Sequence, residues 1–313
     1  MIIVIGSSNI DFVSNACRVP CPGETVSGKN FTVTPGGKGA NQAVAVGRLG
    51  GDIKFINKVG ASDKYVDTLL EGFRWAGVDL KYVEVQPDAY CGAALVMVGE
   101  NGQNLITIVA NANAFITPEF VKKHERLVAS AGVVLVEFGI PMEAAIYAIR
   151  IAKEVGCCTI VNPAPAMPIS DSFYRTIDVI TPNETEAWTL TGIKVRDIET
   201  ADRATSFFHK KGVPQVVITL GCNGAYVSSN GRKEWVPGYA VKAVDATAAG
   251  DAFNGGLAYA IDSGADVFRA ARFACAVGAL CVTRSGSSRS MPTLSEVESF
   301  MATAIAGKLW RSA

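Results

Sequence analysis

The sequence has almost no histidine, no excess of either charge and no long apolar run. Only two of its 313 residues are histidine, and 29 Lys and Arg balance 29 Asp and Glu. Without a basic excess or a basic run, we expect neither nucleic acid nor a membrane surface as a partner. The apolar stretch within residues 1–12 is too short for a signal peptide, and no run of about 18 apolar residues predicts a membrane span. We therefore expect a cytoplasmic protein.

Cysteine is plentiful, but its spacing offers no obvious pair for a disulfide or a metal. The eight cysteines, an even number that leaves disulfides as an alternative, are Cys17, Cys21, Cys91, Cys157, Cys158, Cys222, Cys275 and Cys281. No two of them form a CxxC motif, and neither His124 nor His209 lies near a cysteine pair. Free thiols pack as small apolar side chains in a reducing compartment. We predict reduced cysteines and no zinc site.

Length and composition fit one or two globular domains. Hydrophobic residues make up 49% of the chain and charged residues 19%, which excludes a disordered or coiled-coil protein. Short apolar runs alternate with segments of helical spacing. The runs are residues 2–5, 133–136, 159–161, 178–180 and 216–219, and the helical segments include 142–155 and 199–211. This alternation predicts an α/β fold, in which helices wrap a mostly parallel sheet and ligands bind beyond the carboxyl ends of its strands.

Two segments, residues 12–34 and 89–111, interrupt this alternation. Both are rich in β-branched and aromatic residues and lack a helical period. Residues 91–110 contain two apolar runs around Gly-Glu-Asn-Gly, which predicts a hairpin. We expect a small discontinuous β lid from these segments, inserted into a body of residues 1–11, 35–88 and 112–313. Ordinary strands at the edge of the main sheet are the alternative.

A glycine-rich segment, residues 34–50, is the first candidate site. Gly36, Gly37 and Gly39 can adopt backbone angles denied to other residues and allow a ligand close to main-chain N–H groups. A helix is expected from about Ala40, with its positive end toward this loop. The segment matches neither GxGxxG nor GxxxxGK[ST], so those nucleotide fingerprints do not apply. A packed glycine turn before a helix is the alternative.

Residues 243–260 are the second candidate. Ala248, Ala249 and Gly250 lead into a predicted helix, whose free N–H groups could stabilise negative charge. Asp251 lies at the same helix start, where a carboxylate can serve as an N-cap. The alternative is a general base that accepts the proton of an attacking hydroxyl beside an anion hole.

Five motifs together resemble the ribokinase-like (PfkB) sugar kinase family. They are GGKGANQA at residues 36–43, NPAPA at 162–166, TPNETEA at 181–187, ITLGCNGAY at 218–226 and DATAAGDAFNGG at 245–256. Their order and spacing match the family over essentially the whole chain. The resemblance implies an ATP-dependent kinase that phosphorylates a primary hydroxyl of a small sugar, with ribose O5 as the expected acceptor. It also implies a homodimer formed through the lid.

The family's sugar-binding and catalytic residues can be carried over by position. The sugar site corresponds to Asn9, Asp11, Gly37, Lys38 and Asn41. Asp251 matches the catalytic base, which also contacts the sugar, and Ala248, Ala249 and Gly250 match the anion hole.

The nucleotide and cation positions fall in the second half of the chain. Asn183 and Glu186 match a motif associated with phosphate and Mg²⁺, although the pair could simply cap a helix. The positions expected beside ATP are Thr219, Gly221, Gly224, Gly250 and Cys275. The positions that surround a monovalent cation, expected to be K⁺, are Asp245, Thr247, Cys281, Arg284, Gly286 and Ser290. Several of these cation ligands are backbone carbonyls in the family, which agrees with the preference of hard cations for oxygen.

One position departs from the family in the expected sugar site. Members of the family carry a sugar-binding glutamate two residues before the proline that corresponds to Pro141 of this chain. The present chain has Gly139 at that position, and its nearest glutamate, Glu137, is displaced by two residues. Such a shift moves a side chain about 6–7 Å along a strand. We expect Gly139 to open space, so a kinase for deoxyribose, a hexose or a nucleoside is an alternative. A sensor without catalysis is a further alternative, whereas a nicotinamide dehydrogenase lacks its GxGxxG motif.

Overall fold

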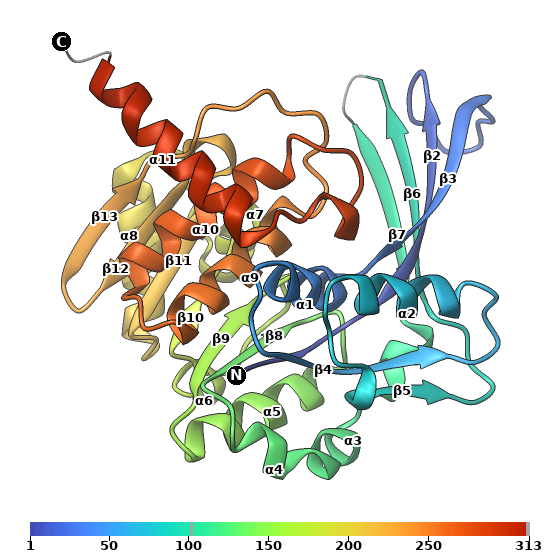
Figure 1. Ribbon diagram of the computed structural model, residues 1–313, viewed down its shortest axis with the longest axis horizontal. Helices are drawn as coiled ribbons and strands as arrows, with labels where there is room; N and C mark the ends of the chain where they lie inside the picture. Colours follow the sequence, from blue (N-terminus) through green and yellow to red (C-terminus); the bar gives the residue numbers. More distant parts are fainter. Residues whose placement is uncertain (101–102, 311–313) are drawn as a thin grey trace.

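The computed structural model describes residues 1–100 and 103–310 as a layered α/β body with a second, smaller sheet projecting from it (Figure 1). In this described part, a nine-stranded sheet forms the centre of the body. Its order is β13 (Arg232–Val236), β12 (Ala225–Ser229), β11 (Gln215–Thr219), β10 (Val179–Ile180), β9 (Cys158–Asn162), β8 (Val133–Glu137), β1 (Ile2–Ile5), β4 (Ile53–Gly60) and β5 (Val83–Gln86). Only the β11–β12 and β12–β13 pairs are antiparallel. The predicted fold class is confirmed.

The central strands are continuous runs of Ile and Val because both faces of the sheet are covered. Ile2 and Val4 of β1 belong to the core on one face, and Ile3 and Ile5 to the core on the other. The first face is covered by α1 (Lys38–Arg48), α2 (Val66–Trp75), α9 (Ala249–Asp262), α10 (Val267–Cys281) and α11 (Leu294–Trp310). The second is covered by α3 (Pro118–Lys123), α4 (Glu125–Val128), α5 (Met142–Glu154), α6 (Asp171–Tyr174), α7 (Glu184–Thr191) and α8 (Ile198–Lys210).

Short 3₁₀ turns connect several of these elements. They are η1 (Leu80–Tyr82), η2 (Asn111–Phe115), η3 (Gly221–Asn223) and η4 (Ser288–Ser290). None of the helices in the described ranges is long and apolar enough to cross a bilayer. No two of the eight cysteines are joined by a disulfide in the described residues.

The smaller sheet has the order β3 (Gly28–Gly36), β2 (Asn9–Ala16), β6 (Gly92–Gly99) and β7 (Asn104–Val109). β2 and β6 run parallel, and the other two pairs are antiparallel. β6 and β7 pair as the predicted hairpin requires, although residues 101–102 of its turn lie outside the described residues. β2 begins at Asn9, three residues before the predicted segment, because the chain passes from β1 into β2 after residues 6–8 alone. This sheet therefore starts beside the carboxyl end of β1.

Candidate active site

Polar residues gather where the parallel strands of the main sheet end. Glu137, Asn162 and Thr219 are the last residues of β8, β9 and β11. Thr181 follows β10 directly, and Ser7 is the second residue after β1. Because parallel strands present their carboxyl ends at one edge, these five side chains belong to the same side of the sheet.

The glycine-rich loop lies against this edge with almost no free space. A Cβ on Gly37 would come 2.6 Å from Ser8 Cα, and one on Gly39 would come 2.6 Å from the carbonyl carbon of Gly6. Gly37 also has φ of +93°, a left-handed value that favours glycine. The amide of Ala40 donates to the carbonyl of Ser7 at 2.8 Å. The helix, α1, begins at Lys38, two residues before the predicted start, because this packing already holds its first turn.

Asp251 lies in the first turn of α9, and its side chain points to α1. Asn41 Nδ2 donates to Asp251 Oδ2 at 2.9 Å, and Gln42 Nε2 donates to Oδ1 at 3.2 Å. Asp251 is buried, and two side chains of a second helix, α1, hold its carboxylate. The N-cap interpretation of Asp251 is wrong, because the N-cap residue of α9 is Ala248.

Ala248 adopts a left-handed conformation with φ of +61°, which is uncommon for a residue with a Cβ. This turn leads the chain into α9 at Ala249, so Gly250 lies in the first helical turn. The first amides of a helix have no carbonyl partner within it, and they carry the positive end of its dipole. Asp251 therefore lies beside backbone N–H groups that can receive an anion.

Lys38 connects the electrostatics of the predicted sugar site with those of Asp251. Burial alone lowers the pKa of Lys38, but the surrounding carboxylates outweigh burial, and the pKa is raised. These carboxylates are Asp251, Glu137, Glu186 and Asp11. Burial raises the pKa of Asp251, and Lys38, Asn41 and Gln42 oppose that rise. A buried carboxylate with a raised pKa can accept a proton more readily than an exposed one.

Asp11 also lies in this charged cluster, at the beginning of β2. Burial, followed by the charge of Asp251, raises the pKa of Asp11 to about 6, while Lys38 opposes the rise. Within the described residues, the buried Oδ1 of Asp11 has no hydrogen-bond partner. Asn9 differs, because its Oδ1 accepts from Asn113 Nδ2 at 2.9 Å. Asp11 therefore has an acceptor free for a ligand, whereas Asn9 Oδ1 already has a protein donor.

The motif comparison missed a buried hydrogen-bond network behind Asp251. Gln42 Nε2 also donates to Asn162 Oδ1 at 3.1 Å, and Thr181 Oγ1 donates to Asn254 Oδ1 at 2.6 Å. Asn162 Nδ2 reaches the Thr181 carbonyl, and Asn254 Nδ2 reaches the Gly250 carbonyl at 2.8 Å. The network thus ties the start of α9 to α1 and to two strand ends. Amide side chains inside apolar segments were the feature of the sequence that could have revealed it.

The structure corrects the expectation that Gly139 opens space. A Cβ at this position would lie 2.6 Å from Ser7 Oγ and 2.7 Å from Glu137 Oε2. Glu137 is fully buried and accepts hydrogen bonds from the backbone amides of Ser7 and Gly139. Burial raises the pKa of Glu137, and these amides oppose that rise. Glu137 therefore fills the place next to Gly139, and its contacts hold the chain at the end of β1.

Asn183 and Glu186 form a capping box at the start of α7. Glu186 Oε2 accepts from the amide of Asn183 at 2.9 Å, and Asn183 Oδ1 accepts from the amide of Glu186 at 2.8 Å. The helix-capping alternative is therefore correct as a structural role. Glu186 is nevertheless close enough to Lys38 and Asp251 for their charges to influence its pKa, which burial raises.

The other predicted nucleotide positions lie in the adjoining loop and helix. Thr219 forms a parallel bridge with Asn183, which brings the two motifs together. Gly221 and Gly224 both have positive φ, and a Cβ on Gly224 would lie 2.1 Å from the Val236 carbonyl oxygen. Cys275 is buried in α10, where burial raises its pKa to about 12. Its thiol is therefore an apolar packing group.

The predicted cation positions converge on two loops. Asp245 accepts from the amides of Thr247 at 2.9 Å and Gly286 at 3.0 Å. Cys281 Sγ lies 3.9 Å from the Thr247 carbonyl oxygen and 3.0 Å from Ser290 Oγ. The structure thus brings together residues 245–247 and 281–290.

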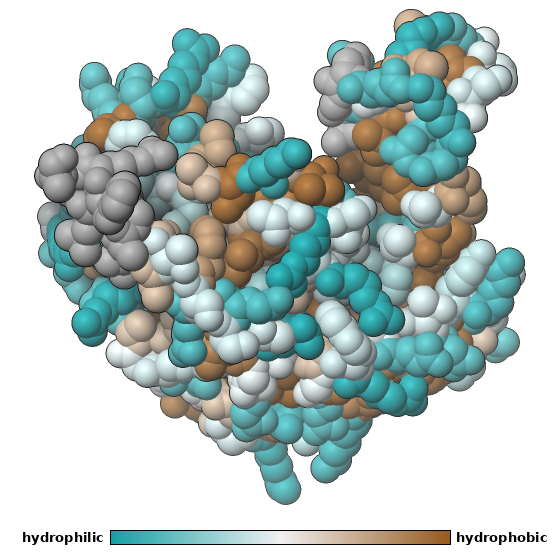
Figure 2. Space-filling model, turned by 45° about the horizontal axis from the view of Figure 1, so that its top comes forward, coloured by the Kyte–Doolittle hydropathy of each residue, from teal (hydrophilic) through white to brown (hydrophobic). Residues whose placement is uncertain are grey.

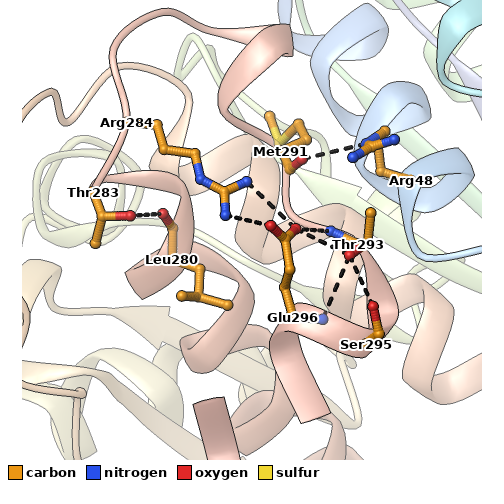
Figure 3. Close-up of polar contacts among 8 residues, drawn as sticks. All are labelled: Arg48, Leu280, Thr283, Arg284, Met291, Thr293, Ser295 and Glu296. Carbon is orange, nitrogen blue, oxygen red and sulfur yellow. Dashed lines mark hydrogen bonds and ion pairs between the residues drawn. The ribbon is translucent and has the colours of Figure 1, made fainter. Parts of the chain in front are cut away.

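The guanidinium of Arg284 points toward Glu296 of α11 (Figure 3). Its Nη2 lies 2.7 Å from Glu296 Oε1, and Glu296 also accepts from the amide of Thr293. The hydrogen bond from Arg284, followed by the opposing effect of burial, leaves the pKa of Glu296 at about 2. The positive charge of Arg284 is thereby paired with Glu296.

Comparisons with known proteins agree with this arrangement. The model of the pfkB family carbohydrate kinases matches residues 1–294. Ribokinase of Haemophilus influenzae is 39% identical over 95% of this chain and 97% of its own. Deoxyribokinase of Salmonella typhi is 32% identical over 96% of this chain and 98% of its own. The structure of Arabidopsis thaliana ribokinase complexed with ribose and ATP superposes with a TM-score of 0.88, at 33% identity and over 96% and 97% of the two chains.

Proposed function

Because this chain belongs to the pfkB family of carbohydrate kinases and is an ATP-dependent sugar kinase, we propose that it transfers the γ-phosphoryl group of ATP to O5 of D-ribose. The observation that carries this proposal is one charged cluster in which the charge of Lys38 acts on two carboxylates, that of buried Asp251 and that of Asp11 with its buried, unpartnered Oδ1. Asp11 offers an unpaired oxygen to sugar hydroxyls. Asp251 then accepts the proton of the attacking primary hydroxyl.

The proposed roles of the remaining residues follow from phosphoryl-transfer chemistry. The reaction needs alignment and charge stabilisation more than covalent participation by the protein. Lys38 offsets the charges of the two carboxylates, and Asn41 and Gln42 orient the Asp251 carboxylate and oppose the rise in its pKa that burial causes. The amides at the start of α9 that we assign to the anionic phosphoryl group are those of Ala248, Ala249 and Gly250, and the Ala249 amide donates to the Ala246 carbonyl at 3.3 Å in this structure. Gly37 lets the loop approach β1, and Asn9 supports the sugar side of the site.

The donor is proposed to lie over residues 219–224 and the start of α9. Thr219, Gly221 and Gly224 provide a turn with little side-chain bulk, and Cys275 provides an apolar surface toward the adenine. Mg²⁺ would be held near Asn183 and Glu186. Their chemistry fits, since Glu186 Oε1 is a carboxylate oxygen outside the capping hydrogen bonds. When bound with ATP, the ion would neutralise phosphate charge.

The acceptor can be tested by measuring ADP release over ribose, 2-deoxyribose, hexoses and nucleosides. We expect the highest kcat/KM with ribose. The deoxyribokinase relative makes deoxyribose the second candidate, and a higher kcat/KM with 2-deoxyribose than with ribose would replace the proposal. The filled space beside Gly139 argues against an acceptor that needs extra room there.

We further propose a K⁺ site at the two loops that contain Asp245 and Gly286. The donor set fits a monovalent cation, because it offers a carboxylate and backbone carbonyls at Thr247, Cys281, Arg284 and Gly286, with the hydroxyl of Ser290 nearby. Hydrogen bonds from Thr247 and Gly286 outweigh burial and lower the pKa of Asp245, so this carboxylate is ionised at neutral pH. The pairing of Arg284 with Glu296 keeps its positive charge from competing with the ion.

Replacement of Na⁺ by K⁺ at constant ionic strength is therefore expected to raise kcat several-fold. The physical reason is that a filled cation site would fix residues 245–247 and 284–286 beside the start of α9. Initial rates in matched chloride buffers measure the effect, with choline as the inert reference cation. Equal rates in all three salts would contradict the K⁺ site.

The smaller sheet is proposed to act as a lid over the sugar and as the contact in a homodimer. β6 and β7 expose large apolar side chains, namely Leu95, Leu105, Ile106, Ile108 and Val109. The projecting sheet stands off the body, with apolar residues along it (Figure 2). An exposed apolar sheet in an isolated chain is an aggregation hazard unless a partner covers it.

A charge placed on this sheet is expected to separate the dimer. Ile106→Glu should shift the mass measured by light scattering from two chains to one, because a buried unpaired carboxylate opposes association. Val155→Glu is the matched control, since Val155 is 54% exposed and Ile106 is 55% exposed, but Val155 lies at the end of α5. A wild-type protein that is monomeric at micromolar concentration would refute the dimer.

A further inference from the structure

A buried serine outside the family motifs is connected to the proposed base through a single side chain. Ser288 is the first residue of η4 and is 5% exposed. Its Oγ lies 2.8 Å from Asn41 Oδ1, and Asn41 Nδ2 lies 2.9 Å from Asp251 Oδ2. Three elements that are distant in the sequence, η4, α1 and α9, thus share one short hydrogen-bond chain.

The chemistry of Ser288, Asn41 and Asp251 fixes which group donates in each of these hydrogen bonds. An ionised carboxylate only accepts hydrogen bonds, so the amide nitrogen of Asn41 must face Asp251. Asn41 Oδ1 consequently faces Ser288, and only the hydroxyl can donate between them. Each donor is polarised by the next, which strengthens a buried chain of this kind.

Ser288 belongs to a loop that is fastened at several further points. Ser287 Oγ donates to the Pro35 carbonyl at 2.6 Å, which ties the loop to β3. Ser290 Oγ lies against Cys281, and the amide of Gly286 donates to Asp245. Ser288 is the member of this loop whose side chain bonds to a partner of Asp251.

We propose that Ser288 is a positioning residue for phosphoryl transfer, which holds the amide of Asn41 in the orientation that supports the ionised carboxylate of Asp251. The proposal rests on the proposed function, because it assumes that Asp251 is the base. Without the hydroxyl, Asn41 Oδ1 is buried without a donor, and its amide is free to turn. The donor to Asp251 Oδ2 is then lost for part of the time.

Ser288→Ala tests this role through the pH dependence of the reaction. We expect kcat to fall about tenfold, as for loss of a hydrogen bond that supports a charged group. The acidic limb of the kcat profile should move to higher pH, because fewer donors to the carboxylate raise the pKa of Asp251. KM for ATP should stay the same, and Ser288→Thr, which keeps a hydroxyl, should restore both kcat and the limb.

Ser287→Ala is the matched control, because Ser287 is 4% exposed and also loses one hydrogen bond, but to the Pro35 carbonyl and not to a partner of Asp251. Its acidic limb should coincide with that of the wild type. If Ser288→Ala and Ser287→Ala lose the same stability and neither moves the limb, the role of Ser288 is structural only and the proposal is overturned. If Ser288→Ala does not fold, Ser288→Cys, a weaker donor of similar size, should move the limb in the same direction, and an unmoved limb overturns the proposal.

The Asp251→Asn variant separates this proposal from the proposed function. If Asp251→Asn is inactive while Ser288→Ala keeps the wild-type profile, the role of Ser288 fails and the base assignment stands. If Asp251→Asn retains near-native turnover, the base assignment fails, and the role of Ser288 fails with it.

Discussion

Replacement of Asp251 by asparagine should lower kcat by about 10²–10⁴-fold, the range expected for loss of a positioned general base. Asparagine has nearly the same volume, but its amide cannot accept the proton of the sugar hydroxyl. It also presents an NH₂ group to Asn41 or Gln42, both of which donate to the aspartate. Steady-state ADP release with ribose measures kcat, and ATP binding measured by calorimetry should remain close to wild type.

Asp266→Asn is the matched control for this experiment. Asp266 is also a helix-start aspartate, but it caps α10 by accepting from the amides of Phe268 and Arg269. Asparagine caps helices about as well as aspartate, so activity and stability should both change little. Near-native turnover of Asp251→Asn would show that the carboxylate is not the base. An unfolded Asp251→Asn protein would show that its first role is to hold α1 against α9.

Gly39→Ala is expected to remove activity by displacing the loop that carries the proposed sugar site. The added Cβ would lie 2.6 Å from Gly6 Cα and 2.7 Å from the Ser7 amide nitrogen, and both of these atoms are backbone. Because β1 lies between β8 and β4, that backbone has little freedom to move away. We expect a loss of about 3 kcal/mol in the free energy of unfolding. Lys38 and Asn41 would also be displaced from Asp251.

Urea denaturation and ADP release measure the two effects of Gly39→Ala. Gly72→Ala is the control, because Gly72 is inside α2 and an added Cβ meets no atom within 4 Å. Alanine there should increase stability by about 0.5–1 kcal/mol through its helix propensity. Wild-type stability of Gly39→Ala would mean that the loop can move away from β1 without cost.

The main sheet is largely predictable from the sequence because its central strands carry no polar interruption. β8 and β11 contain unbroken runs of Val, Leu and Ile at residues 133–136 and 216–218, which are buried on both faces. β4 escapes such a prediction because Lys54 and Lys58 interrupt it. The fold tolerates these charges since Lys54 pairs with Asp52 and Asp79, and Lys58 with Glu84. Asp79 and Glu84 are tertiary neighbours, which a pattern along the β4 segment does not contain.

Some residues of the candidate site are likewise predictable from the sequence, whereas others depend on tertiary contacts. Motif spacing identifies Asp251 and Asn41, and the structure places them within hydrogen-bond distance of each other. Motif spacing does not identify Gln42, Asn254 or Ser288, because their importance depends on which side chains meet across α1, α9 and η4. The role of Glu137 is likewise not predictable from its position two residues before Gly139, because that role depends on the backbone amides of Ser7 and Gly139, which donate to its carboxylate.

The close contact between residues 36–39 and residues 6–8 has a mechanical consequence for the smaller sheet. β2 starts at this contact and β3 ends at it, and Asp11 lies only two residues from the start of β2. Because the two backbone segments leave almost no free space at this contact, a tilt of the projecting sheet would also move the Asp11 carboxylate. A sugar hydroxyl bound by Asp11 would therefore act on β2 close to the point where the smaller sheet joins the body.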